Sequence, residues 1–262
     1  MSASGPGAGR LASLRAVAAA KQEVRARVWA RLEERRVARF PGAPGRIPNF
    51  IGAEAAAHRL SELPEWERAR TLKCNPDSPQ LPVRAAALAA GKLLFVAVPR
   101  LASARPFLRL DPERLERQEV LPRRAVSIAH AARHGTAVTV AEMPRLDLVV
   151  CGVVAVNPQG VRVGKGGGFS DLELALLVTA GLVDDATVIA TTVHDLQVAD
   201  EELPETEHDF RVDLVVTPER VLRTGARKRT PGLIWEHLDP AKIAEIPLLT
   251  ELSGRRRPPP PV

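Results

Sequence analysis

The 262-residue sequence contains no tyrosine, and aromatic residues make up only 3% of it. Proteins that bind single-stranded nucleic acid by base stacking need aromatic side chains as platforms. The composition therefore argues against a nucleic-acid partner of this kind. Long hydrophobic runs are also missing, and no apolar stretch approaches the roughly 18 residues that a membrane span needs. The sequence therefore predicts no membrane partner.

Cysteine is scarce as well, since Cys74 and Cys151 are the only two. Both lie in or beside apolar stretches and have neither CxxC nor zinc-ligand spacing, so a disulfide framework and a structural zinc site are excluded. This pattern favours a reducing, cytoplasmic location. The net charge of +6 comes from 37 basic and 31 acidic residues. A modest, dispersed positive charge suits an anionic small molecule such as a nucleotide.

The ends of the sequence differ from its middle. Residues 1–11 are rich in Gly, Ser and Ala and predict a disordered leader, and residues 254–262 predict a disordered Arg/Pro tail. Between them, residues 12–253 contain no linker or repeat and predict a single domain, for which we expect a monomer or weak homodimer. Apolar spacing predicts helices over residues 11–39 and 52–63.

After these helices, the hydrophobic pattern changes from helical periodicity to short apolar runs. Runs of this kind are typical of strands buried on both faces of a parallel sheet, and they cover residues 93–98, 146–156, 187–193 and 212–216. Helical patterns separate them at residues 82–90, 126–134 and 171–182. Alternating strands and helices predict an α/β fold with three αβα layers and a mainly parallel sheet, in which ligands bind beyond the carboxyl ends of the strands.

A glycine-rich segment follows the strongest strand and precedes an apolar helix. It runs from Arg162 to Asp171 and contains Gly164, Lys165, Gly166, Gly167, Gly168, Phe169 and Ser170. Glycines let successive backbone amides converge on an anion, helped by the helix N-terminus and by Arg162 and Lys165. The alternative is a flexible turn with Asp171 as the helix cap. The spacing matches neither a P-loop nor a dinucleotide fingerprint.

Two loop carboxylates stand at strand ends, Asp171 after one strand and Asp209 before another. A pair of this kind can share one Mg²⁺, which takes oxygen ligands and keeps several waters. His208 beside Asp209 could serve as a base or a metal ligand. The alternative is a solvated acidic loop.

Two further segments have two interpretations each. Lys21 and Arg25 are four residues apart and share one helix face, which is either a ligand-binding face or a solvated basic one. Asp77 in a Pro-rich turn is either a helix N-cap or a carboxylate for a polar ligand. We find no convincing nucleophile, since no Ser lies in a GxSxG elbow and neither Cys has a basic neighbour.

In order and spacing, these segments together resemble the 5-formyltetrahydrofolate cyclo-ligase family, over roughly residues 20 to 220. The family pattern is a K-x-x-x-R helix, an acidic turn, a G-K and P-R pair, a D-L-V strand, a glycine-rich loop ending in Asp, and a final Q…P…D…V-D…T segment. The sequence also resembles the branch called methenyltetrahydrofolate synthetase domain-containing proteins. That second resemblance rests on R-I-P-N-F at residues 46–50, the loop ending at Glu173, and V-H-D-x-Q-V around His194.

The resemblance implies a fold of the sugar-isomerase/CoA-transferase type and a reaction. The reaction is MgATP-dependent conversion of 5-formyltetrahydrofolate to 5,10-methenyltetrahydrofolate, with release of ADP and phosphate. Lys21, Arg162 and Lys165 would then be catalytic, and Arg25 with residues 164–170 would complete the ATP site. Asp77 and Phe169 would bind the folate, and Asp171 and Asp209 would hold Mg²⁺.

The sequence departs from the family pattern at three places. Phe169-Ser170 stands where the family has two tyrosines, Asp77 stands where it has a longer glutamate, and Cys151-Gly152 replaces Pro-Gly. The residues that would bind phosphate and metal therefore match the family pattern better than the residues that would bind folate. An alternative follows, in which the protein is a non-catalytic family member that binds nucleotide or folate as a regulatory module. A different acyl or sugar-phosphate substrate is a third reading.

Overall fold

An eight-stranded sheet forms the centre of the computed structural model, which describes residues 6–226 and 228–256. The strand order is β10-β9-β8-β5-β1-β2-β3-β4, and a separate two-stranded sheet pairs β6 with β7. The strand bounds are β1 Thr71–Cys74, β2 Leu93–Ala97, β3 Phe107–Leu110, β4 Thr136–Val138, β5 Leu148–Cys151, β6 Ala155–Val156, β7 Arg162–Val163, β8 Val188–Thr192, β9 Leu214–Val216 and β10 Val221–Arg223.

The five neighbouring strands β9, β8, β5, β1 and β2 are parallel. The outer strands pair antiparallel, β10 at one side of the sheet and β3 and β4 at the other. Every residue of β5 is buried, as expected for a strand covered on both faces. The predicted α/β class with a mainly parallel sheet is therefore confirmed. The relation to the sugar-isomerase/CoA-transferase type stays a prediction.

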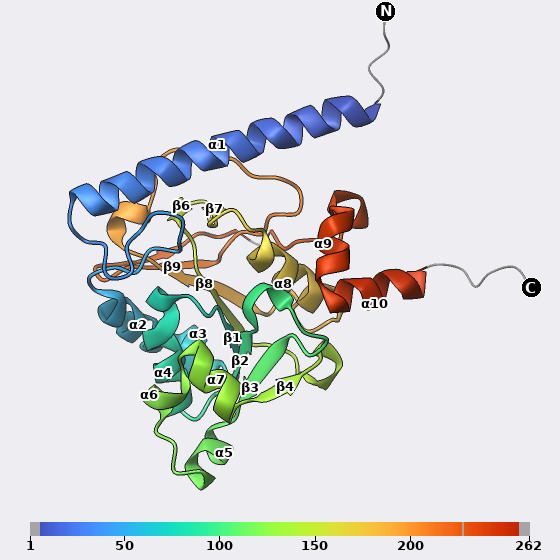
Figure 1. Ribbon diagram of the computed structural model, residues 1–262. Helices are drawn as coiled ribbons and strands as arrows, with labels where there is room; N and C mark the ends of the chain where they lie inside the picture. Colours follow the sequence, from blue (N-terminus) through green and yellow to red (C-terminus); the bar gives the residue numbers. More distant parts are fainter. Residues whose placement is uncertain (1–5, 227, 257–262) are drawn as a thin grey trace, which may run out of the picture.

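Helices cover both faces of the sheet (Figure 1). One face packs against α2 to α7, and the other packs against α8, α9 and α10. Along β5, Leu148 and Val150 point to the first face, and Val149 and Cys151 point to the second. The helix bounds are α1 Pro6–Glu34, α2 Ala53–Ser61, α3 Pro64–Arg68, α4 Leu81–Ala89, α5 Pro112–Arg117, α6 Pro122–Ala125, α7 Ile128–His134, α8 Phe169–Thr179, α9 Pro240–Glu245 and α10 Pro247–Arg256. The 3₁₀ turns are η1 Ser78–Gln80, η2 Pro99–Leu101, η3 Val140–Glu142, η4 Asp195–Gln197 and η5 Trp235–His237.

The long helix α1 lies outside these layers, across one end of the molecule and beside the β6–β7 hairpin (Figure 1). Its residues Val24, Val28 and Leu32 are buried in a separate apolar cluster with residues of the hairpin. These are the residues that the helical spacing places on one face. The packing therefore brings Lys21 and Arg25 next to the loop after β7.

Several predicted bounds are wrong. Helix α1 ends at Glu34 rather than near residue 39, because Arg36 has a left-handed backbone (φ 55°) and Ala38 instead pairs with Phe50. The predicted strand over residues 146–156 is two strands, since β5 ends before Gly152 and β6 belongs to the hairpin. Strands β1, β3, β4 and β10 were not predicted from the sequence.

Helices extend into both of the terminal segments that the sequence predicts to be disordered. Helix α1 begins at Pro6, inside the predicted leader, and α10 continues to Arg256, inside the predicted tail. Residues 1–5 and 257–262 lie outside the described residues, so the prediction for them stays untested. Within residues 6–226 and 228–256, no helix is long and apolar enough to cross a membrane.

Candidate active site

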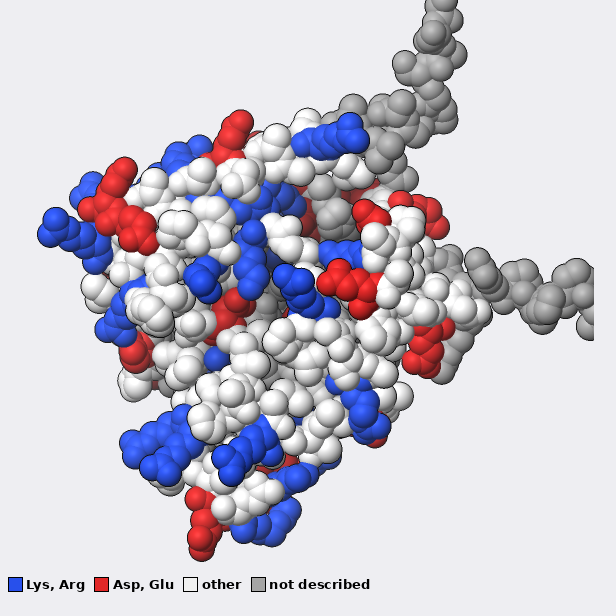
Figure 2. Space-filling view, viewed as in Figure 1, with Lys and Arg blue, Asp and Glu red and all other residues white. Residues whose placement is uncertain are grey.

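A cleft of about 880 Å³ opens between α1, the glycine-rich loop and the ends of the sheet strands. Segments that follow β1, β2 and β5 line it, which places the cleft beyond the carboxyl ends of parallel strands, as expected for this fold. In Figure 2, Lys and Arg side chains gather below α1 around a recess in which acidic side chains are also visible. The cleft is lined by every site residue that the sequence singles out, namely Lys21, Arg25, Asp77, Arg162, Gly164, Lys165, Gly166, Gly167, Gly168, Phe169, Ser170, Asp171 and Asp209.

The glycine-rich loop is shaped by two left-handed glycines, Gly166 (φ 105°) and Gly168 (φ 68°). Gly168 is the N-cap of α8, so the expectation that Asp171 caps this helix is wrong; Asp171 lies in the first turn instead. A left-handed residue at the cap suits glycine because a side chain would be strained there. The loop thus enters α8 with the helix N-terminus at the cleft, where an anion is favoured.

Helix α1 contributes two cations to this loop. Arg25 is only 8% exposed, and its Nε donates to the Gly164 carbonyl at 2.6 Å. Burial lowers the pKa of Arg25 from its ordinary value. Lys21 Nζ lies 2.5 Å from Asp209 Oδ2. The alternative of a solvated basic face is therefore wrong for these two residues.

Asp209 is 3% exposed and carries a dense set of donors. Its Oδ2 accepts from Lys21 and from the backbone N–H and hydroxyl of Thr206. Burial raises the pKa of Asp209, but the charge and hydrogen bond of Lys21, the Thr206 N–H and the charge of Arg162 outweigh it, and the pKa lies below its ordinary value. The carboxylate is therefore ionised at neutral pH, as a metal ligand must be.

Arg162 connects the two carboxylates that the sequence predicts as metal ligands. It is 2% exposed, its guanidinium lies 3.4 Å from the centre of the Phe210 ring, and it forms an ion pair with Asp171. Cation–π stacking and the ion pair fix the guanidinium at the cleft wall.

The chemistry of the two carboxylates suits Mg²⁺. Asp171 uses Oδ1 for Arg162 and Asp209 uses Oδ2 for Lys21 and Thr206. Among the residues whose side chains the structure describes, no partner binds Asp171 Oδ2 or Asp209 Oδ1. Two carboxylate oxygens suit Mg²⁺, which takes few protein ligands and completes its shell with phosphates and water. In the same part of the chain, no group of three or more His, Cys, Asp or Glu side chains is placed to hold a metal.

Asp77 forms an ion pair with Lys165 of the glycine-rich loop at 3.1 Å. It occupies the N-cap position of η1, as one of its two interpretations predicts, but its side chain makes no capping hydrogen bond. The buried Arg84 donates to the Asn75 and Asp77 carbonyls and fixes the turn. Gly152 packs so tightly here that an added Cβ would lie 3.2 Å from Asp77 Oδ2, which explains why this strand end carries no side chain.

Two cations near the cleft were not predicted from the sequence. Lys73, on β1, is 2% exposed and pairs with Glu173 of α8, which lines the cleft. Lys242, on α9, donates to the Gly167 carbonyl at 2.7 Å and lies over the Phe169 ring at 4.7 Å. The K-G-x-G-F-x-D-L-E pattern marks Glu173, the partner of Lys73, and gives no signal for Lys242.

The segment around His194 and Gln197 has a structural role, since the Gln197 amide donates to two buried carbonyls, those of Val153 and Val154. His208 lines the cleft and its Nδ1 lies 3.3 Å from Nδ1 of His237. Its predicted role as a base or metal ligand stays a prediction.

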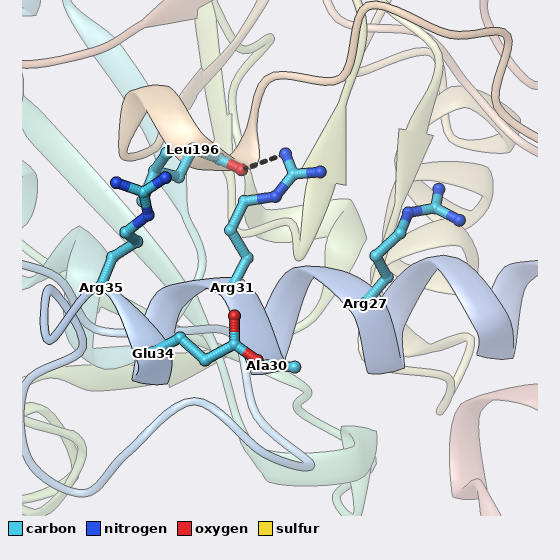
Figure 3. Close-up of a pocket in the computed structure, with 6 residues that line it drawn as sticks. All are labelled: Arg27, Ala30, Arg31, Glu34, Arg35 and Leu196. Atoms are coloured by element: carbon cyan, nitrogen blue, oxygen red, sulfur yellow. Dashed lines mark hydrogen bonds between the residues drawn. The ribbon is translucent and has the colours of Figure 1, made fainter.

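A second, smaller cavity of about 460 Å³ lies on α1 and is lined by Arg27, Arg31, Arg35, Ala30, Glu34 and Leu196. Figure 3 shows the three arginines rising from one side of the helix, with Arg31 bonded to the Leu196 carbonyl. Arg27 pairs with Glu201. Because it contains none of the predicted site residues, we place the candidate site in the larger cleft.

The chain belongs to the 5-formyltetrahydrofolate cyclo-ligase family, whose sequence profile matches residues 17–218.

Relatives in animals share most of this chain. The "Methenyltetrahydrofolate synthase domain-containing protein" of Mus musculus is 38% identical over 90% of this chain, and that of Homo sapiens is 36% identical over 93% of it. The chain spans 64% of the length of each. The solved structure of Aquifex aeolicus 5,10-methenyltetrahydrofolate synthetase is 20% identical and covers 83% of this chain and 99% of that one, with a TM-score of 0.49.

Proposed function

We propose that the protein catalyses the MgATP-dependent conversion of 5-formyltetrahydrofolate to 5,10-methenyltetrahydrofolate, with release of ADP and phosphate. Membership in the cyclo-ligase family supports the reaction class. The observation that carries the proposal is the convergence of Lys21, Arg25, Arg162 and two metal-competent carboxylates on the glycine-rich loop, opposite Asp77. We also propose a cytoplasmic location, on the cysteine pattern.

The chemistry explains why such a site is needed. The formyl oxygen of the substrate is a poor leaving group, so it first attacks the γ-phosphorus of ATP, and the bond to ADP breaks. N10 of the folate then attacks the activated formyl carbon, N10 loses its proton, and phosphate leaves with the former formyl oxygen. Phosphoryl transfer of this kind depends on positioning and charge neutralisation more than on covalent catalysis.

The residues of the cleft can supply both the positioning and the charge neutralisation that phosphoryl transfer needs. Lys21, Arg162, Lys165 and the loop amides would neutralise and orient the triphosphate, and Arg25 would hold the loop through the Gly164 carbonyl. Mg²⁺ held by Asp171 and Asp209 would supply further neutralisation of phosphate charge. Asp77 and the Phe169 ring would contact the folate.

The cleft pairs these charges with one another. Lys21 pairs with Asp209, Arg162 with Asp171, and Lys165 with Asp77. A ligand that brings both an anion and a cation can take up the charges of the first two pairs, since Lys21 and Arg162 would turn to phosphate and their carboxylates to metal. MgATP is such a ligand, and each buried charge of these two pairs would then keep a partner of opposite sign.

One observation favours a second candidate function, a non-catalytic module that binds nucleotide or folate. Ser170 stands in the cleft where the family has a tyrosine, and its nearest polar contact is the Asn75 amide at 3.4 Å, a long hydrogen bond. The ring that would pack there is missing, while the phosphate side is intact. This reading predicts nucleotide binding without product.

The test is the near-ultraviolet absorbance of the methenyl product after mixing the full chain with Mg²⁺, ATP and 5-formyltetrahydrofolate. The proposal expects a rising signal that disappears when ATP or Mg²⁺ is left out. A protein that binds ATP but gives no product supports the binding module instead. Ser170→Tyr separates a weakened family site, in which activity rises, from a pocket rebuilt for another substrate, in which it falls.

A further inference from the structure

A buried ion pair lies at the floor of the cleft and is not used by the phosphate machinery. Glu173 on α8 is 5% exposed and Lys73 on β1 is 2% exposed. Lys73 Nζ donates to Glu173 Oε2 and to Asn75 Oδ1. Because Glu173 and Asn75 both line the cleft, the pair lies directly beneath the ligand space.

Only one oxygen of this carboxylate is satisfied. Among residues 13–226 and 228–254, Glu173 Oε2 bonds Lys73 and nothing bonds Oε1. Oε1 is also not among the fully enclosed side-chain atoms that lack a partner. A carboxylate that is mostly withdrawn from water therefore presents one free acceptor to the cleft. A ligand donor at Oε1 would complete the hydrogen bonding of a carboxylate whose other oxygen is already paired with Lys73.

The charge at this position decides what kind of group can complete it. Phosphate oxygens are anionic and carry no donor, so Glu173 repels the triphosphate. Asn75 and Asp77, in the segment that follows β1, line the cleft together with Glu173, and Asp77 is a proposed folate contact. A carboxylate paired with an ammonium group presents oxygens that accept hydrogen bonds and donate none. The complementary ligand is a flat ring edge with N–H donors.

We propose that Glu173 is a specificity residue whose free Oε1 accepts a hydrogen bond from the donor edge of a pterin ring, formed by the 2-amino group and N3–H, and that Lys73, bonded to Oε2, is the positioning residue that orients it. This inference rests on the proposed folate substrate and adds to it the side chain that recognises the ring. An exchange of the pair for two apolar side chains should preserve the fold but remove the recognition.

The first experiment uses the double variant Lys73→Met/Glu173→Leu. Replacing both members of a buried ion pair by apolar residues of similar volume is often neutral for stability, whereas removing one is not. We expect an unchanged melting temperature, unchanged affinity for a non-hydrolysable ATP analogue, and 5-formyltetrahydrofolate binding weakened about tenfold to a hundredfold, measured by titration calorimetry. The matched control is Arg145→Met/Asp184→Leu, which removes a surface pair outside the cleft and should leave folate affinity unchanged. A folded double variant with unchanged folate affinity would show that the pair is only structural.

The second experiment needs no variant. The wild-type protein should bind the 2-desamino-2-methyl analogue of the folate about tenfold to a hundredfold more weakly than the parent, and equal affinity overturns the assignment of Glu173. Wild-type protein that binds the folate, discriminates against the analogue and forms no product supports the inference and contradicts the proposed catalysis. Wild-type protein that does not bind the folate contradicts both.

Discussion

The upper wall and the floor of the cleft hold their charges in different ways. On the wall, Lys21 pairs with Asp209 and Arg162 pairs with Asp171, and each carboxylate keeps one oxygen free for another partner. Each of these pairs has one partly exposed side chain, Lys21 at 14% and Asp171 at 20%. On the floor, both Lys73 of the sheet and Glu173 of α8 are more than nine-tenths buried. The wall pairs can be exchanged for a ligand, whereas the floor pair is fixed by the core. The wall residues are therefore suited to binding charged groups of MgATP, and Glu173 is suited to recognising a ring by hydrogen bonding.

The largest effect is expected from Asp171→Asn. The amide still accepts from Arg162 but supplies no negative charge to a metal, so Mg²⁺-dependent turnover should fall about a hundredfold or more while stability changes by about 1 kcal/mol. Turnover and urea denaturation measure the two effects. Asp184→Asn makes the same change in a surface pair with Arg145 and should leave turnover intact. Unchanged turnover in Asp171→Asn would contradict the metal assignment.

A smaller effect is expected from Lys21→Met, which leaves Asp209 buried with only Thr206 and the charge of Arg162 to stabilise it. Loss of one charged contact to phosphate should raise the KM for ATP about tenfold and lower stability by about 1–3 kcal/mol. Steady-state kinetics with each substrate varied provide the measurement, and Lys21→Arg should recover part of the loss. If only the KM for the folate changed, α1 would face the other ligand.

Lys242→Met should have a milder effect still. The side chain acts through the loop, by one bond to the Gly167 carbonyl and one contact with the Phe169 ring. Together these contribute about 1–2 kcal/mol, so the KM for ATP should rise a few-fold with little change in kcat. A kcat that fell while the KM stayed constant would instead place Lys242 in the chemical step.

The smallest effect concerns pH. Because the pKa of Asp209 is lowered in the folded protein, its contribution to stability is present above the ordinary value of 3.8 and is lost as pH falls below it. In Lys21→Met the main cause of that lowering is gone. The difference in free energy of unfolding between wild type and variant should therefore be full at pH 7 and shrink as pH falls toward 3.8 and below, measured by urea denaturation. A difference that stays constant with pH would mean that Asp209 is not the partner that matters.

The sequence predicted the candidate site residues well where they lie in short motifs that follow one another in a fixed order. Lys21, Arg25, Arg162 and the two aspartates were predicted as a set, and the structure gathers all of them in one cleft. Four buried strands and the alternation with helices were enough for the α/β class, although not for the antiparallel edges. The roles assigned to these residues remain predictions.

The residues that were missed depend on contacts that no local pattern shows. Strand β1 is only four residues long and contains Lys73, so it lacks the apolar run that marks its neighbours. The partner of Lys73, Glu173, is a hundred residues further along the chain, in a stretch of α8 where the neighbouring positions from Leu172 to Val178 are apolar. Lys242 lies beyond the segment that resembles the family. A buried ion pair becomes visible only when tertiary packing places both charges.

The way in which α1 is attached to the rest of the fold affects its local opening in solution. Its buried contacts are those of a small cluster on the β6–β7 hairpin, and its polar contacts reach residues 139 and 188 positions away. The helix is therefore an outer part of the fold, of the kind that opens locally without unfolding the rest. Each opening would take Lys21 and Arg25 from the cleft at once. A bound nucleotide would shift this equilibrium toward the closed form. We therefore expect amide hydrogen exchange along α1 to slow when the site is occupied.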